Sequence, residues 1–115
     1  MYLNPIKAAA ALMVFATPAL ADYSCAFDRE CVDADACAAT DFTVDVQKTA
    51  SILGTVFGDL MIIASKGDDN LHTYIAAGDG ADYLMSVTPN GAIFTTHIAD
   101  GPMSITYLGT CQGAF

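Results

Sequence analysis

The stretch "SVTPNGAIFTTHIADGPMSITYLGTC", residues 86–111, decides the fold class. Its apolar and polar residues recur with period two, which is typical of strands with one dry and one wet face. Asn90-Gly91 stands between two apolar runs and predicts a type I′ hairpin turn, in which both central residues need a positive φ. Asp100-Gly101 predicts the next reversal. The stretch therefore predicts an antiparallel meander with strands at about 82–88, 92–98 and 103–109.

The preceding residues extend the same pattern. Residues 41–46 alternate apolar and polar side chains, residues 51–58 read as one strand that is bent at Gly54, and residues 60–64 read as a buried strand. The segment 71–87 reads as a strand, a Gly-rich loop and a second strand. The whole pattern predicts an all-β fold, a small antiparallel β-barrel or sandwich of six to eight strands.

The first 21 residues have the composition of a secretory signal. Lys7 precedes an apolar stretch that is too short and too Ala-rich for a stable membrane anchor, and Ala19-Leu20-Ala21 is a small-x-small cleavage site. We therefore expect residues 1–21 to be removed. Residues 22–115 then form a single small domain of a periplasmic or secreted protein, which has no membrane segment after cleavage.

Four cysteines follow the predicted signal, three of them within "CAFDRECVDADAC". An even number of cysteines in a short exported chain indicates two disulfides, which have three possible connectivities. Structural zinc sites favour cysteines separated by two to four residues, whereas these gaps hold five, and the Cys-x-x-Cys motif of redox proteins does not occur. We expect a disulfide-stapled N-terminal segment that forms an acidic loop or a single helical turn.

Two pairings of the cysteines stand out. We favour Cys25 with Cys111 and Cys31 with Cys37, because the first bond would close a loop of about 87 residues and contribute over ~4 kcal/mol in the chain-entropy treatment. Such a bond would tie the two ends of the domain together. The alternative pairs Cys25 with Cys31 and Cys37 with Cys111.

The charge balance limits the partners. The chain has 13 Asp and Glu against 4 Lys and Arg, for a net charge of −9. Nucleic acids and anionic membranes are bound mainly through Lys and Arg, so neither is expected as a partner. A cationic protein suits such a surface, although acidity also serves solubility alone. The sequence leaves the oligomeric state open.

No constellation of residues indicates catalysis. The chain has no Gly-x-Ser-x-Gly motif, and two disulfides would leave no free thiol. The acids between Asp28 and Asp41 lack the order of an EF-hand, and "GDGADYL" holds one fragment of a calcium-binding repeat that works only in many copies. His72 is expected to share a face with Tyr74, and His97 to point outward. We predict a protein that is not an enzyme and has no cofactor.

A few residues resemble a known family. The chain opens with Tyr23-Ser24-Cys25, carries Gly80-Ala81-Asp82-Tyr83 and ends near Cys111, and in these features it resembles the bacterial inhibitors of c-type lysozyme. The resemblance implies an eight-stranded periplasmic barrel, closed by a disulfide, that blocks the cleft of a lysozyme with a loop. Two of the family's contact positions differ, since Asp79 replaces a Ser and no Lys or Arg follows Tyr83.

The sequence therefore predicts a non-catalytic exported binding module, an inhibitor of a cationic protein such as lysozyme. Its contact loop would comprise Asp79, Gly80, Ala81, Asp82 and Tyr83. The alternatives are a protein that binds a small ligand or a metal ion through the barrel mouth, His72 and His97, and an envelope protein of structural role.

Overall fold

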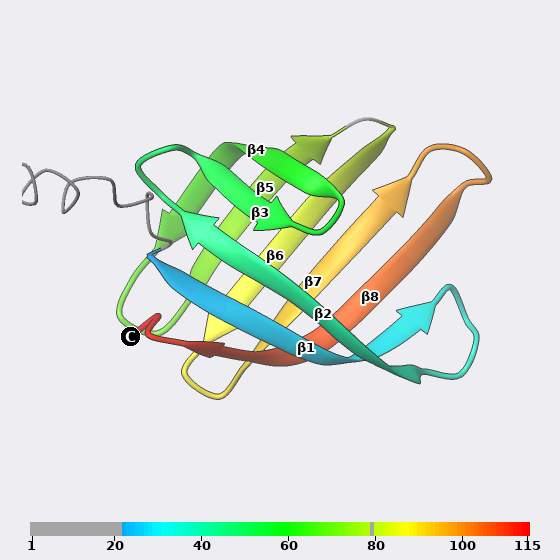
Figure 1. The fold of residues 1–115 in the computed structure, drawn as a ribbon, viewed down its shortest axis with the longest axis horizontal. Coiled ribbons are helices and arrows are strands. Elements are labelled where there is room, and N and C mark those ends of the chain that lie inside the picture. The colour runs from blue at the N-terminus through cyan, green and yellow to red at the C-terminus, as the bar shows by residue number, and fades with distance from the viewer. Residues whose placement is uncertain (1–21, 79) are drawn as a thin grey trace, which may run out of the picture.

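The chain forms a closed antiparallel barrel of eight strands, each hydrogen-bonded to its neighbours in sequence (Figure 1). The computed structural model describes residues 22–78 and 80–115. The strands are β1 (Tyr23–Val32), β2 (Ala38–Gln47), β3 (Ile52–Thr55), β4 (Gly58–Gly67), β5 (His72–Gly78), β6 (Ala81–Thr88), β7 (Gly91–Ile98) and β8 (Met103–Gln112). The all-β prediction is confirmed. The predicted signal segment, residues 1–21, lies outside the described residues and stays a prediction.

The core fills the barrel with the alternate side chains of each strand. Phe27, Phe42, Phe94 and Tyr107 form an aromatic cluster, with ring centroids between 4.3 and 6.3 Å apart. Burying each such side chain stabilises the fold by roughly 1.5–3 kcal/mol. The other buried apolar residues are Tyr23, Cys25, Val44, Val46, Leu53, Leu60, Tyr74, Ala76, Met85, Val87 and Ala92.

The barrel closes where β1 pairs with β8. Cys25 lies directly opposite Cys111 in this pairing, and the two are disulfide-bonded across 86 positions of sequence. Gly109 lies opposite Phe27, and a Cβ on it would stand 2.0 Å from the Ala26 carbonyl oxygen. Only glycine allows the two strands to approach this closely. The favoured pairing of Cys25 with Cys111 is confirmed.

The cysteine-rich opening is mostly strand. β1 continues through Cys31 to Val32, and a short turn leads into β2 at Ala38. The Cys31–Cys37 disulfide, also the favoured pair, staples this hairpin. Of the two forms expected between Cys31 and Cys37, the acidic loop is confirmed and the helical turn was wrong, because Cys31 and Val32 pair with β8 as strand and only residues 33–37 remain for the turn.

Residues 51–58 are a hairpin and not one bent strand. The four-residue β3 turns at Val56-Phe57 and returns as β4, with Thr55 opposite Gly58. The Thr55 hydroxyl donates to the Gly58 carbonyl (2.9 Å) and accepts from the Phe57 amide (3.1 Å). Gly58 takes a φ of +120°, which favours glycine. These features make a tight turn out of an apolar stretch that reads as continuous strand.

The strand expected at residues 60–64 exists, but it is not buried. β4 extends to Gly67, and beyond Leu60 nearly all its residues are exposed, Met61 and Ile63 by 65% and 61%. The reason is the shortness of β3. It pairs with β4 only over residues 58–61, so the rest of β4 has β5 as its one strand neighbour among the described residues.

The β6–β7 turn falls one residue earlier than predicted. Thr88 pairs with Gly91, which leaves Pro89 and Asn90 as the central residues. Neither Asn90 nor Gly91 has a positive φ, so the type I′ turn was wrong. Pro89 fixes its own φ near −65°, which a type I′ turn does not permit, and the Thr88 hydroxyl accepts from the Asn90 amide (3.2 Å). The reversal near Asp100-Gly101 is confirmed, with a φ of +132° at Gly101.

We predict that the two disulfides contribute unequally to stability. Replacing Cys25 and Cys111 by Ala should lower the free energy of unfolding by up to about 4.6 kcal/mol, and replacing Cys31 and Cys37 by up to about 2.2 kcal/mol, because the first closes the longer loop in the unfolded chain. Urea denaturation of the two double variants measures both values. A larger loss from the Cys31–Cys37 pair would contradict this ranking.

We predict that Gly109→Ala opens the seam between β1 and β8. The added Cβ must displace backbone atoms of Ala26 and Phe27, so the free energy of unfolding should fall by at least ~2 kcal/mol. Thermal denaturation measures the loss. Gly91→Ala is the control, since its Cβ would have its nearest neighbour at 3.4 Å and its φ is not positive, and it should change stability by less than about 0.5 kcal/mol.

Candidate functional site

The two ends of the barrel differ in charge. The β1–β2, β3–β4, β5–β6 and β7–β8 turns lie at one end, on the right in Figure 1. Five exposed carboxylates lie in the described residues of these turns or within two residues of them: Asp33, Asp35, Asp59, Asp82 and Asp100. Those same residues include no Lys or Arg. We call this the acidic end, and its field favours a cationic partner.

The β1–β2 turn at the acidic end is held firmly. Asp33 accepts a hydrogen bond from the Ser104 amide (2.9 Å), and its own amide donates to the Ser104 carbonyl (2.9 Å). The Cys31–Cys37 disulfide closes the same hairpin. These bonds join the turn to β8, so the carboxylates around it are presented on a rigid frame.

An apolar tip projects among these carboxylates. Val56 and Phe57, the central residues of the β3–β4 turn, are 75% and 69% exposed. Phe57 stacks on Phe42 at the end of the core, with ring centroids 5.6 Å apart. This tip was not predicted from the sequence. The signal that would have found it is Thr55-x-x-Gly58, the same spacing as Thr88-x-x-Gly91.

The predicted contact loop is mostly strand. Asp79 lies outside the described residues, Gly80 lies in the β5–β6 turn with a φ of +73°, and the remaining three residues belong to β6. Asp82 points outward opposite His97, whereas Tyr83 points inward and stacks on Phe94 at 5.6 Å. A hollow of about 460 Å³ beside them is lined by Gly78, Gly80, Ala81, Asp82, His97, Ile98, Ala99 and Pro102.

The two histidines lie at opposite ends of the barrel. His72 opens β5 and lies opposite Gly67 and Val87, on the same side of its strand as Tyr74, as predicted. His97 lies near the end of β7 and is exposed, also as predicted. Their separation means that they do not share one metal site. The described residues contain no group of three or more metal-ligating side chains.

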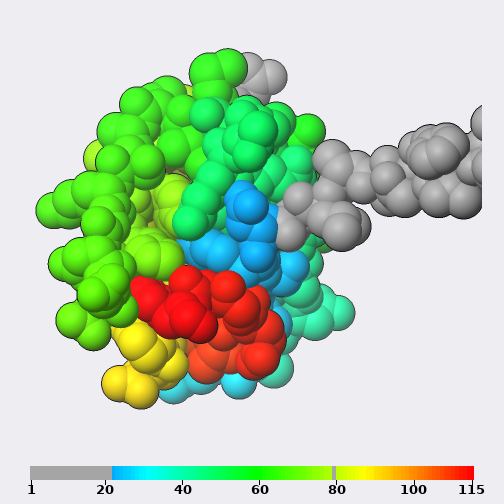
Figure 2. Space-filling view, turned by 90° about the vertical axis from the view of Figure 1, so that its left-hand side faces the viewer, coloured from blue at the N-terminus to red at the C-terminus, as the bar shows by residue number. Residues whose placement is uncertain are grey.

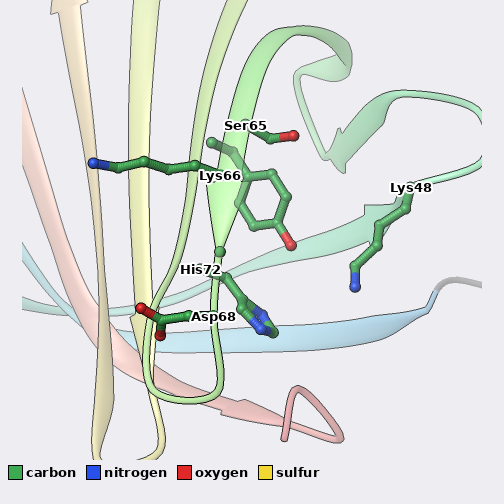
Figure 3. Close-up of a pocket in the computed structure, with 7 residues that line it drawn as sticks. Lys48, Ser65, Lys66, Asp68 and His72 are labelled. Atoms are coloured by element: carbon green, nitrogen blue, oxygen red, sulfur yellow. The ribbon is translucent and has the colours of Figure 1, made fainter.

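The end that carries His72 also has a hollow, of about 290 Å³. Figure 2 looks onto this end, where the C-terminal residues lie next to β4 and the β4–β5 turn. Lys48 and His72 face the hollow, while Lys66 and Asp68 point away from it (Figure 3). The Nδ1 of His72 is buried and has no hydrogen-bond partner among the described residues, and the Phe115 ring stacks on the imidazole at 4.3 Å.

Tyr74 lines this hollow and is hydrogen-bonded to a second tyrosine, Tyr23. The hydroxyls of Tyr23 and Tyr74 are 2.7 Å apart and both side chains are buried. Burial raises the pKa of Tyr23 far above its ordinary value, and the hydrogen bond to Tyr74 adds to the effect. At the acidic end, burial and a hydrogen bond to Glu30 raise the pKa of Tyr107 in the same direction. Both phenols are therefore structural and stay protonated at neutral pH.

Comparisons with models of protein families, with curated proteins and with solved structures found no match to this chain. None of the described residues form a helix long and apolar enough to cross a membrane.

We predict that the barrel loses stability above about pH 10. A tyrosine with a raised pKa in the folded state holds its proton more tightly there than in the unfolded chain, so the stabilisation is complete below the unfolded pKa of about 10 and falls as the pH rises. Urea denaturation at pH 8 and pH 11 measures the fall. Tyr23→Phe should lower stability by about 1 kcal/mol at pH 8, since it leaves the Tyr74 hydroxyl unpaired, and should reduce the alkaline loss. An unchanged loss in this variant would contradict the assignment to Tyr23.

Proposed function

We propose that this protein is a non-catalytic binding module, exported to the periplasm or secreted, that captures a cationic protein at the acidic end of its barrel. The observation that carries the proposal is the acidic end itself, with five exposed carboxylates and no Lys or Arg in its described residues. The most specific version is inhibition of a c-type lysozyme, in line with the residues shared with that family.

The combination of charge and apolar surface supports binding. Complementary charge speeds encounter with a basic partner, whereas affinity comes mainly from a few apolar or aromatic anchors. Val56 and Phe57 supply such anchors, because they are largely exposed and stand beside the carboxylate of Asp59. The turn that holds them has two hydrogen bonds to the Thr55 hydroxyl, so little conformational entropy remains to be lost on binding.

The chemistry of the cysteines supports export. All four are in disulfides, and such bonds persist in oxidising compartments. A domain of this size also gains stability from covalent bracing, because its single small core supplies little on its own. The predicted signal at residues 1–21 agrees with this location.

The contact that we propose differs from the loop of the lysozyme inhibitors. Tyr83 points into the barrel and Asp82 out of it, so a partner would meet Asp82, Asp59 and Phe57 first. The proposed contact is thus a face that combines several turns.

We predict salt-dependent binding of a c-type lysozyme. Biolayer interferometry at 20 and 300 mM NaCl should give a dissociation constant at least tenfold weaker at the higher concentration, because the ionic contacts are screened. The double variant Asp82→Asn and Asp100→Asn should bind roughly 3- to 10-fold more weakly. A turbidity assay with the same lysozyme tests inhibition.

The control removes the same charge elsewhere. Asp22→Asn with Asp69→Asn deletes two carboxylates outside the acidic end and should leave binding within about twofold of the original. If no lysozyme binds at 20 mM NaCl, the lysozyme version is wrong. If both double variants weaken binding equally, the acidic end is not the binding face.

A further inference from the structure

A second hollow at the acidic end has the chemistry of an arginine site. It measures about 550 Å³ and lies on the side of the barrel where the β3–β4 turn meets the end of β5. Two aromatic side chains and one carboxylate face it, over an apolar floor. The lining residues are Phe57, Asp59, Leu60, Met61, Ala77, Gly78 and Tyr83.

Phe57 is held in place although it is exposed. The Thr55 hydroxyl accepts from its amide (3.1 Å) and fixes the turn, and the Phe42 ring supports it from the core side at 5.6 Å with an interplanar angle of 29°. Exposing 69% of a phenylalanine is unfavourable in water, so the ring contributes little to folding on its outer face. That outer face is free to stack on a ligand.

Tyr83 forms the opposite wall, and glycine keeps the space beside it open. Its ring stacks on Phe94 at 5.6 Å. A Cβ at position 78 would stand 3.1 Å from the Leu60 Cδ2 and 3.2 Å from the Tyr83 Cε2, both closer than ordinary contact. Gly78 has no positive φ, so its backbone does not require glycine. The missing side chain leaves room at the floor of the hollow.

Asp59 supplies the charge. It is exposed, follows the turn directly, and lies opposite Gly54 across the β3–β4 pairing. Asp45 lies on the far side of the same glycine, and the described residues that line the hollow include no Lys or Arg. Two aromatic rings and a carboxylate suit a guanidinium, which stacks on aromatic rings and donates two parallel hydrogen bonds to a carboxylate.

We propose that this hollow, between Phe57 and Tyr83 and beside Asp59, receives an arginine side chain of the cationic partner. The inference rests on the proposed function and names the group that the acidic end selects. Arginine fits better than lysine here. A compact ammonium is more strongly hydrated and does not stack, whereas the guanidinium plane covers a ring and directs its donors to the carboxylate.

The direct test uses peptides, so it does not depend on knowing the partner. Acetylated and amidated Gly-Arg-Gly, Gly-Lys-Gly and Gly-citrulline-Gly are titrated to 20 mM against the isotope-labelled protein. The arginine peptide should shift the amide signals of residues 57–61 and 77–83, with an affinity at least threefold above that of lysine and fivefold above that of citrulline. Equal shifts from all three peptides would overturn the proposal, since the site would then ignore the guanidinium.

Variants locate the effect. Asp59→Asn keeps the shape of the side chain and should lower the affinity for the arginine peptide at least fivefold. Gly78→Ala narrows the floor of the hollow and should lower this affinity at least threefold. Asp100→Asn removes the same charge from a part of the acidic end that lies outside the hollow. It should change the affinity for the arginine peptide by less than 1.5-fold. Thermal denaturation of each variant checks that the fold is retained, above all for Gly78→Ala, whose added Cβ comes close to Leu60 and Tyr83. If Asp59→Asn and Asp100→Asn lower the affinity equally, the peptide is attracted by the overall charge of the acidic end, and the proposed arginine site is wrong.

The same variants separate this inference from the proposed function. If lysozyme binds the original protein and the Asp59→Asn and Gly78→Ala variants equally, the acidic end binds the partner without an arginine in this hollow, and only the inference fails. If the arginine peptide binds as expected but no basic protein does, the hollow stands and the proposed function fails. If the Asp59→Asn and Gly78→Ala variants lose binding of both the arginine peptide and lysozyme, the result supports both the inference and the proposed function.

Discussion

The seam between β1 and β8 is the constraint on which the rest of the structure depends. A meander of eight strands becomes a barrel only if its first and last strands pair, and that pairing must hold together residues that are 86 positions apart. Loop-closure entropy opposes such a contact. Two features of the sequence offset it: the Cys25–Cys111 disulfide, which restricts the unfolded chain, and Gly109, which lets the strands approach. Among the described residues, closure leaves two stretches without a second strand neighbour, the part of β4 beyond β3 and residues 38–44 of β2.

The sequence predicted most of this fold because its signals are local or covalent. Period-two alternation identifies strands by their apolar faces, and the even set of cysteines predicted two disulfides, of which the favoured pairing is confirmed. The errors lie at the turns. A threonine hydroxyl that bonds two residues ahead made a tight turn at Val56-Phe57, where the apolar composition indicates a strand. At Pro89-Asn90, the fixed φ of proline overrode the strong preference of Asn-Gly. Turn geometry depends on such single side chains, and a pattern of hydrophobic residues contains no information about their hydrogen bonds or fixed dihedral angles.

The sequence predicts the negative charge of the candidate site but not where in the fold that site lies. Composition predicts an acidic surface, which suits a partner of positive charge and also serves solubility. Where the acids gather follows from topology, because alternate turns of a meander lie at the same end, and residues as far apart as Asp33 and Asp100 meet only after closure. The predicted contact loop illustrates the limit. Its residues are near the site, but strand β6 divides their side chains between the inner and outer faces, and that division follows from register.

The exposed apolar residues at the acidic end argue for a partner of opposite charge and against a second copy of this chain. Val56, Phe57 and Met61 together expose enough apolar surface to favour association with another protein. Two identical barrels that met through this surface would bring two sets of carboxylates together at low dielectric, and like charges repel strongly there. A basic protein meets no such penalty, since its cations neutralise the carboxylates while its apolar groups cover the tip. The acidic surroundings thus allow one end of the barrel to keep an exposed aromatic anchor while discouraging self-association.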